Sequence, residues 1–170
     1  MVSEENKKFL LNLARKTLED NLEGKESDVE NIPDELMNKG ASFVTINIDG
    51  ENRGSIGTLF EHQELFLDVI ENAKIAAFED KRFMPLTNDN LKKTNIEISL
   101  IKKPKKLSYE TEEDILNQIK EKIHGVIIKN GVKIGTLLPQ EWDKVDDKIE
   151  FLQTICQKIN LDKNIWKDAK

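Results

Sequence analysis

Residues 43–60 read Phe-Val-Thr-Ile-Asn-Ile-Asp-Gly-Glu-Asn-Arg-Gly-Ser-Ile-Gly-Thr-Leu-Phe, and this stretch decides the fold class. Val44, Ile46 and Ile48 alternate with the residues between them, as in a strand with one buried face. Asp49-Gly50 then marks a tight turn, and a second strand is predicted over residues 55–60. The stretch therefore predicts an antiparallel hairpin.

Helical and strand patterns surround this hairpin. A strand is predicted at residues 94–102, and a second hairpin at residues 126–136 with its turn at Asn130-Gly131. Amphipathic helices are predicted at residues 4–22, 63–79, 111–122 and 147–160. Hairpins set among helices predict an α+β fold, with a mixed or antiparallel sheet and flanking helices, rather than a doubly wound parallel sheet.

The composition is that of a folded protein rather than a disordered one. Of the 170 residues, 38% are hydrophobic and 34% are charged, and the charges are of mixed sign. We therefore expect a single domain over residues 1–170. The single cysteine, Cys156, excludes an internal disulfide, and its place on an apolar stripe predicts a buried thiol.

Charge and hydropathy limit the classes of partner. The net charge of −6 does not favour binding to nucleic acids, whose partners usually carry a basic stripe. The run Lys102-Lys103-Pro104-Lys105-Lys106 is a local exception, either a solvated connection or a patch for phosphate. The absence of aromatic residues within the run favours the connection. Neither a signal peptide nor a membrane span is visible, so a cytoplasmic protein is expected.

Two glycines flank the pair Ser55-Ile56, and this segment is the candidate functional centre. Glycine inside a strand usually marks a bulge or a close approach of another backbone. Arg53, beside exposed N–H groups, would hold a carboxylate or phosphate of a small polar ligand. The alternative is a bulged edge strand on which Arg53 pairs with a surface acid. The candidate ligand-binding residues are Arg53, Gly54, Ser55, Ile56, Gly57, Thr58, Asp80 and Arg82.

Catalytic and metal-binding roles have weaker sequence support. Asp80 and Arg82 stand at a helix end, where they either pin the following loop or take part in catalysis. His124 and Glu97 are the candidate general bases, and Ser55 is the candidate nucleophile, although no Gly-x-Ser-x-Gly elbow is present. The histidines do not stand at metal-ligand spacing, so no metal site is predicted.

Several motifs resemble the AMMECR family, in the family's order and over nearly the whole chain. Arg53-Gly54-Ser55-Ile56-Gly57-Thr58 is similar to its hallmark Leu-Arg-Gly-Cys-Ile-Gly. Residues 76–85, Ala-Ala-Phe-Glu-Asp-Lys-Arg-Phe-Met-Pro, resemble its Ala-Ala-Phe-x-Asp-x-Arg-Phe-x-Pro. Residues 97–100 resemble its Glu-Val-Ser-Leu strand. Its second hairpin and exit are similar to His124-Gly125, Gly135-Thr136 and Leu138-Pro139-Gln140 followed by Trp142. The chain is most similar to the prokaryotic members termed AmmeMemoRadiSam system protein A.

The resemblance implies an α+β fold with a larger and a smaller lobe, and a cleft near the hallmark segment. It also implies a role beside a Memo-like protein and a radical SAM protein, without naming a cofactor. Two residues depart from the family pattern: Asn52 replaces the leucine, and Ser55 replaces the cysteine. Thiolate chemistry at position 55 is thereby excluded. We expect a binding module for a small ligand or partner, with an enzyme using His124 or Glu97 as the alternative.

Overall fold

The structure is a computed structural model that describes residues 2–167. The chain divides into two compact units, Met1–Pro104 and Lys105–Lys170. Both contain helices and antiparallel strands, so the predicted α+β class is confirmed. The single domain expected over residues 1–170 stays a prediction. Across the described residues, no helix combines the length and the apolar character needed to cross a membrane.

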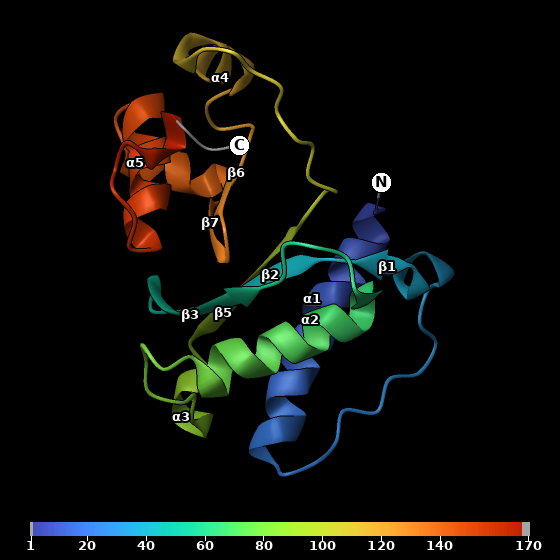
Figure 1. Cartoon of the computed structure of the whole chain (residues 1–170). Helices are drawn as coiled ribbons and strands as arrows, with labels where there is room; N and C mark the ends of the chain where they lie inside the picture. Colours follow the sequence, from blue (N-terminus) through green and yellow to red (C-terminus); the bar gives the residue numbers. More distant parts are fainter. Residues whose placement is uncertain (1, 168–170) are drawn as a thin grey trace. The chain divides into compact units, whose positions relative to one another are not determined.

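A three-stranded antiparallel sheet lies at the centre of the first unit (Figure 1). Strand β2 (Ser42–Ile48) is the middle strand, between β3 (Glu51–Gly57) and β5 (Thr94–Leu100). The turn Asp49-Gly50 has positive φ values of 52° and 84°, as a two-residue hairpin turn of this kind requires. The predicted hairpin is therefore confirmed.

The bounds of the second strand differ from the prediction of residues 55–60. Because the turn has only two residues, pairing resumes at once, with Ile48 opposite Glu51. Strand β3 consequently begins at Glu51 and ends at Gly57, which brings Arg53 and Gly54 into the strand. Thr58 follows the strand instead of belonging to it.

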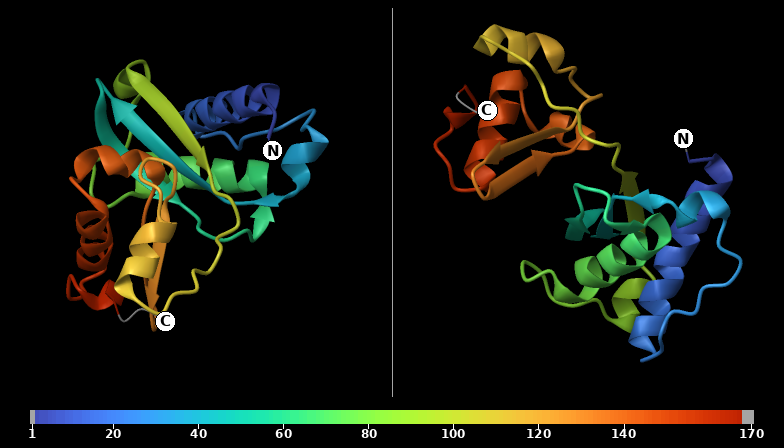
Figure 2. Two further views of the ribbon diagram at one scale, coloured as in Figure 1. Left: turned by 90° about the horizontal axis from the view of Figure 1, so that it is seen from above. Right: turned by 45° about the vertical axis from the view of Figure 1, so that its right-hand side comes forward.

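Two helices pack against each other and cover one face of this sheet (Figures 1 and 2). Helix α1 (Glu4–Leu22) begins after Ser3, whose side chain accepts the N–H of Asn6. Helix α2 (Leu65–Lys74) continues as one turn of π-helix, Ile75–Glu79. The short elements of this unit are η1 (Asp34–Met37), β1 (Lys39–Gly40), β4 (Gln63–Glu64) and α3 (Asn88–Leu91).

Apolar side chains from these elements form the core of the first unit. The stripe of α1 contributes Leu10, Leu13, Ala14 and Leu18, all of them buried. Strand β2 adds Val44 and Ile46 from the face that the helices cover, and Ile48 packs against this core. The alternating residues Thr45 and Asn47 belong to the opposite face. The sheet therefore has one apolar face and one polar face.

The second unit joins a hairpin to two helices. Strands β6 (Val126–Asn130) and β7 (Lys133–Leu137) form the hairpin, and α5 (Lys148–Lys158) packs on it. Its turn is Gly131-Val132, one residue later than predicted, because Asn130 pairs with Lys133 and only Gly131 has a positive φ. The other elements are α4 (Glu112–Gln118), η3 (Pro139–Lys144) and η4 (Ile165–Lys167).

One helix prediction in the second unit was wrong at its C-terminal end. Helix α4 ends at Gln118 and not near residue 122, because Ile119 already has extended backbone angles. Ile123, which lies beyond this end, is 67% exposed. The core of this unit instead centres on Trp142 and Phe151, whose rings stack with centroids 3.7 Å apart.

Candidate functional site

The polar face of the β3-β2-β5 sheet carries a row of side chains that crosses all three strands. Thr45 in the middle strand lies opposite Ser55 on one side and Glu97 on the other. The hydroxyls of Thr45 and Ser55 are 3.0 Å apart and share a hydrogen bond. In the same face, Asn47 donates to Glu97 Oε1 at 2.7 Å. Hydroxyl, amide and carboxylate groups thus share one surface.

A β-bulge shapes this surface at Arg53. Ile46 pairs with Gly54 and Asn47 pairs with Asn52, so Arg53 is the extra residue of the bulged strand. A Cβ atom at Gly54 would collide with the carbonyl oxygen of Ala76. Both features that strand glycines usually signal are therefore present: a bulge and a close backbone approach.

Asp80 and Arg82 clamp the backbone of Ser55 from outside the sheet. The carboxylate of Asp80 accepts the N–H of Ser55 at 3.2 Å, and Arg82 Nη2 donates to the Ser55 carbonyl at 2.9 Å. The two side chains also pair with each other, at 2.6 Å between Arg82 Nη2 and Asp80 Oδ2. The predicted role of pinning the following loop stays a prediction, because these contacts hold β3, which precedes the helix in the chain.

The same contacts keep Asp80 ionised. Its hydrogen bond with the Arg82 guanidinium, reinforced by the N–H groups of Ser55 and Arg82, lowers the pKa of Asp80 from 3.8 to about 2 against the opposing effect of burial. The side chain of Asp80 is buried, whereas that of Arg82 is 58% exposed. The clamp therefore has a fixed anion inside and a solvated cation outside.

Arg53 is the solvent-facing cation of the segment. Its guanidinium lies 3.3 Å from Glu51, and both side chains are more than half exposed. Such a pair contributes little to stability. The N–H of Ser55, which could have joined Arg53 in holding an anion, is already donated to Asp80. Because its pair with Glu51 is weak and exposed, Arg53 can rearrange towards a ligand.

The remaining predicted residues have separate surroundings. Ile56 packs against the core, and Gly57 lies opposite Phe43, whose ring a Cβ at Gly57 would strike. His124 belongs to the second unit, where its Nδ1 accepts the N–H of Lys120 at 3.2 Å. A catalytic role for His124, Glu97 or Ser55 stays a prediction.

Sequence reasoning missed a buried carboxylate beside the hallmark segment. Asp68 in α2 is fully buried, and its Oδ2 accepts from the Ser42 N–H, the Ser42 hydroxyl and Asn72 Nδ2, at 2.8, 2.6 and 2.9 Å. Its Oδ1 accepts the hydroxyl of Thr58 at 2.7 Å. The sequence did contain a signal, because Asp68 and Asn72 stand at i and i+4 within the apolar stripe of the helix.

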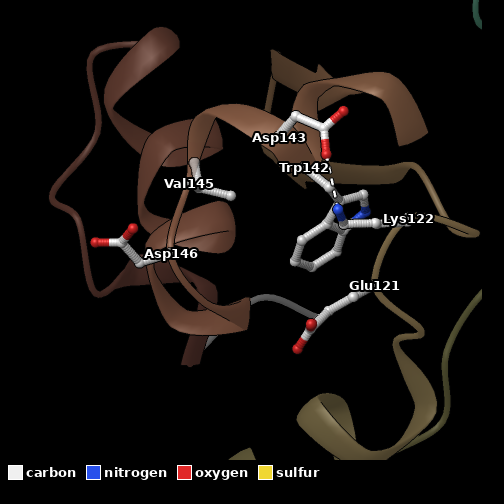
Figure 3. Close-up of a pocket in the computed structure, with 6 residues that line it drawn as sticks. All are labelled: Glu121, Lys122, Trp142, Asp143, Val145 and Asp146. Atoms are coloured by element: carbon white, nitrogen blue, oxygen red, sulfur yellow. Dashed lines mark ion pairs between the residues drawn. The ribbon is translucent and has the colours of Figure 1, made fainter.

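The second unit has a hollow of about 310 Å³ lined by Trp142 and by charged side chains (Figure 3). Lys122 pairs there with Asp143, at 2.9 Å. The carboxylates of Glu121, Asp143 and Asp146 point in different directions in Figure 3, so they do not converge on one cation. We therefore place the candidate site on the sheet of the first unit.

Comparisons with known proteins agree with this architecture. The AMMECR1 family model matches residues 11–170. Protein NEQ441 of Nanoarchaeum equitans is 36% identical over 95% of this chain and 91% of its own, and Protein MK0488 of Methanopyrus kandleri is 34% identical over 95% and 81%. The crystal structure of the uncharacterized protein PH0010 from Pyrococcus horikoshii superposes with a TM-score of 0.92 at 31% identity, covering 98% of this chain and 86% of that one.

The match to the family model and the similarity to archaeal relatives cover the same residues as the sequence motifs. They run through both compact units, so the likeness is to the whole chain rather than to one sheet. The chain belongs to the AMMECR1 family.

Proposed function

We propose that this chain is a binding module that holds a small polar ligand, or a segment of a partner protein, on the polar face of the β3-β2-β5 sheet. The observation that carries the proposal is the clamp of Asp80 and Arg82 on Ser55. A clamp on both backbone groups of Ser55 fixes its main chain, and the hydrogen bond with Thr45 orients its hydroxyl. Fixed polar groups bind at a lower entropic cost than mobile ones.

The chemistry of the face indicates the kind of ligand. Thr45 and Ser55 offer hydroxyls, Glu97 offers an acceptor for N–H or O–H groups, and Arg53 offers a cation for an anionic group. A small molecule or peptide end that carries both a donor and an anion would satisfy all of them. We further propose that the chain is cytoplasmic and works beside a Memo-like protein and a radical SAM protein, as the family resemblance implies.

A thermal-shift screen of anionic metabolites tests this proposal. We expect at least one ligand to raise the melting temperature of the wild type, and Arg53→Ala to lose most of that shift. Lys92→Ala is the matched control, because Lys92 is an exposed cation of the same unit that lies outside the strands of the sheet. A pull-down with the Memo-like protein is run on the same variants. If neither assay distinguishes Arg53→Ala from Lys92→Ala, the proposal fails.

An enzyme is the second candidate, and the position of Glu97 favours it. Its carboxylate is exposed on the polar face and is oriented by Asn47, as a general base would be. A ligand found in the screen decides between the two functions. An enzyme would convert the ligand, and Glu97→Gln would abolish turnover with binding retained. A binding module would leave the ligand unchanged over hours.

A further inference from the structure

We infer that the first unit carries a second binding site, at the end of the sheet, for a small organic anion with an apolar body. A cavity of about 190 Å³ lies there. Two stretches form its walls: Leu59, Phe60 and Glu61 after β3, and Ile101, Lys102 and Lys103 after β5. The second stretch belongs to the lysine run that the sequence left as either a solvated connection or a phosphate patch.

The topology of the sheet brings these stretches together. Strands β3 and β5 both run antiparallel to β2, so both leave the sheet at the end where β2 begins. Two backbone hydrogen bonds fix the exits there: Thr58 donates to the Ser42 carbonyl, and Ile101 donates to the Ala41 carbonyl, each at 2.9 Å. The cavity is therefore a product of the fold and not of one flexible loop.

The lining selects for an anion with an apolar part. The lining includes two lysines and one glutamate, Glu61, and within residues 2–167 neither Lys102 nor Lys103 has an ion-pair partner. Phe60 is 54% exposed and adds an aromatic surface to those of Leu59 and Ile101. The volume lies below the roughly 300 Å³ at which sites for drug-sized ligands begin, so the ligand is a small molecule.

The wall made by residues 59–61 lies between two residues that approach one buried group. Thr58 donates to Asp68 Oδ1 at 2.7 Å, and Nδ1 of His62 lies 3.7 Å from the same oxygen. Asp68 is itself held by Ser42 and Asn72. The hydrogen bonds of Thr58 hold the start of this short segment, which lowers the entropic cost of forming the wall before a ligand arrives.

An NMR titration of the full chain, with calorimetry for affinity, tests the inference with phenyl phosphate and inorganic phosphate as probes. We expect phenyl phosphate to shift the amide signals of residues 59–61 and 101–103, and inorganic phosphate to bind at least ten times more weakly. The double variant Lys102→Gln/Lys103→Gln should weaken phenyl phosphate binding at least tenfold. Phe60→Ala, a change at an exposed side chain, should weaken it at least threefold.

Two control variants show whether binding is specific to this cavity. Lys105→Gln/Lys106→Gln removes the same charge from the same run, at two residues outside the cavity lining. The affinity of this variant for phenyl phosphate should stay within twofold of the wild-type value. Lys92→Gln, a change at an exposed cation of the same unit outside the cavity lining, should also leave the affinity for phenyl phosphate unchanged. Equal weakening by both lysine pairs, equal binding of the two probes, or no shift at residues 59–61 would each overturn the inference.

Discussion

The Asp80 carboxylate accepts four hydrogen bonds, one from Ser55 and three from Arg82. They stabilise its ionised form, so the pKa of Asp80 falls from 3.8 to about 2 on folding. A lowered pKa in the folded state contributes stability above the unfolded value and loses it as the pH falls through the folded value. The contribution at neutral pH is on the order of 2 kcal/mol, at about 1.4 kcal/mol per pKa unit.

Replacement of this carboxylate should therefore have a pH-dependent cost. We expect Asp80→Asn to lower the free energy of unfolding by on the order of 2 kcal/mol at pH 7, because it removes the ionised acceptor. The difference from the wild type should shrink as the pH falls from about 4 to about 2. Urea denaturation at a series of pH values measures the free energy of unfolding of both proteins. Parallel stability curves for the two proteins across that window would show that the clamp makes no such contribution.

Cys156 and position 55 should differ sharply in thiol reactivity. Cys156 is fully buried, and burial raises the pKa of its thiol, so the thiolate is disfavoured and inaccessible. We expect no reaction of the native wild type with a thiol-specific dye, and one equivalent after denaturation. Ser55→Cys, which restores the family residue at a partly exposed position, should add one equivalent that reacts in the native state. Rapid labelling of native wild type would contradict the burial of Cys156.

At the level of elements, strand β3 depends on its glycine next to the bulge. A Cβ at Gly54 would meet the backbone of Ala76, which cannot move aside as a flexible side chain could. We expect Gly54→Ala to lower the free energy of unfolding by about 3 kcal/mol, from overpacking and displaced backbone. Gly24→Ala is the control, since no atom lies within 4 Å of a Cβ added at Gly24 and only its φ of 69° opposes a side chain. Its cost should be about 1 kcal/mol. Similar losses for both variants in denaturant melts would exclude a steric role for Gly54.

The sequence predicted the elements better than their ends. Alternation and Asp49-Gly50 identified the first hairpin, because both signals are local. The start of β3 depends on where pairing with β2 resumes after the turn. Pairing involves two strands, so the sequence of one strand alone does not reveal it. The same reason moved the second turn to Gly131-Val132. Local patterns also missed the change from α-helix to π-helix at Ile75.

The candidate site was located by sequence, but its organisation was not. Glycine spacing and the family motif identified the segment around Ser55. The partners of Ser55 come from positions ten and twenty-five residues away, Thr45 and Asp80, so only the fold reveals them. Asp68 remained hidden because a buried carboxylate needs donors from distant elements, here Ser42 and Thr58.

At the level of the whole molecule, each unit forms a core from its own residues. The first core includes Leu10, Val44 and Val69, and the second includes Trp142, Phe151 and Trp166. Both tryptophans of the chain lie in the second unit, so tryptophan fluorescence reports that unit alone. Far-UV circular dichroism reports both units, because both contain helices.

We therefore expect the two signals to follow different unfolding curves. The fluorescence midpoint should lie at the lower urea concentration, since the second unit is smaller and a smaller unit buries less of its surface. Equilibrium urea melts with both probes test this expectation. A fragment of residues 1–104 is the companion test, and it should unfold cooperatively alone. Coincident curves for the full chain, with an unfolded fragment, would mean that the chain folds as one cooperative unit.

The position of the clamp at the margin of the sheet has a consequence for the behaviour of the protein in concentrated solution. Strand β3 is an outer strand, and outer strands offer unpaired backbone groups to neighbouring molecules. Asp80 and Arg82 occupy the two outward groups of Ser55, at the middle of this strand. The Asp80–Arg82 ion pair thus prevents the Ser55 backbone from pairing with a strand of another molecule. Protonation of Asp80 in acid releases the outward N–H of Ser55, so we expect acid to favour pairing between the β3 strands of two molecules.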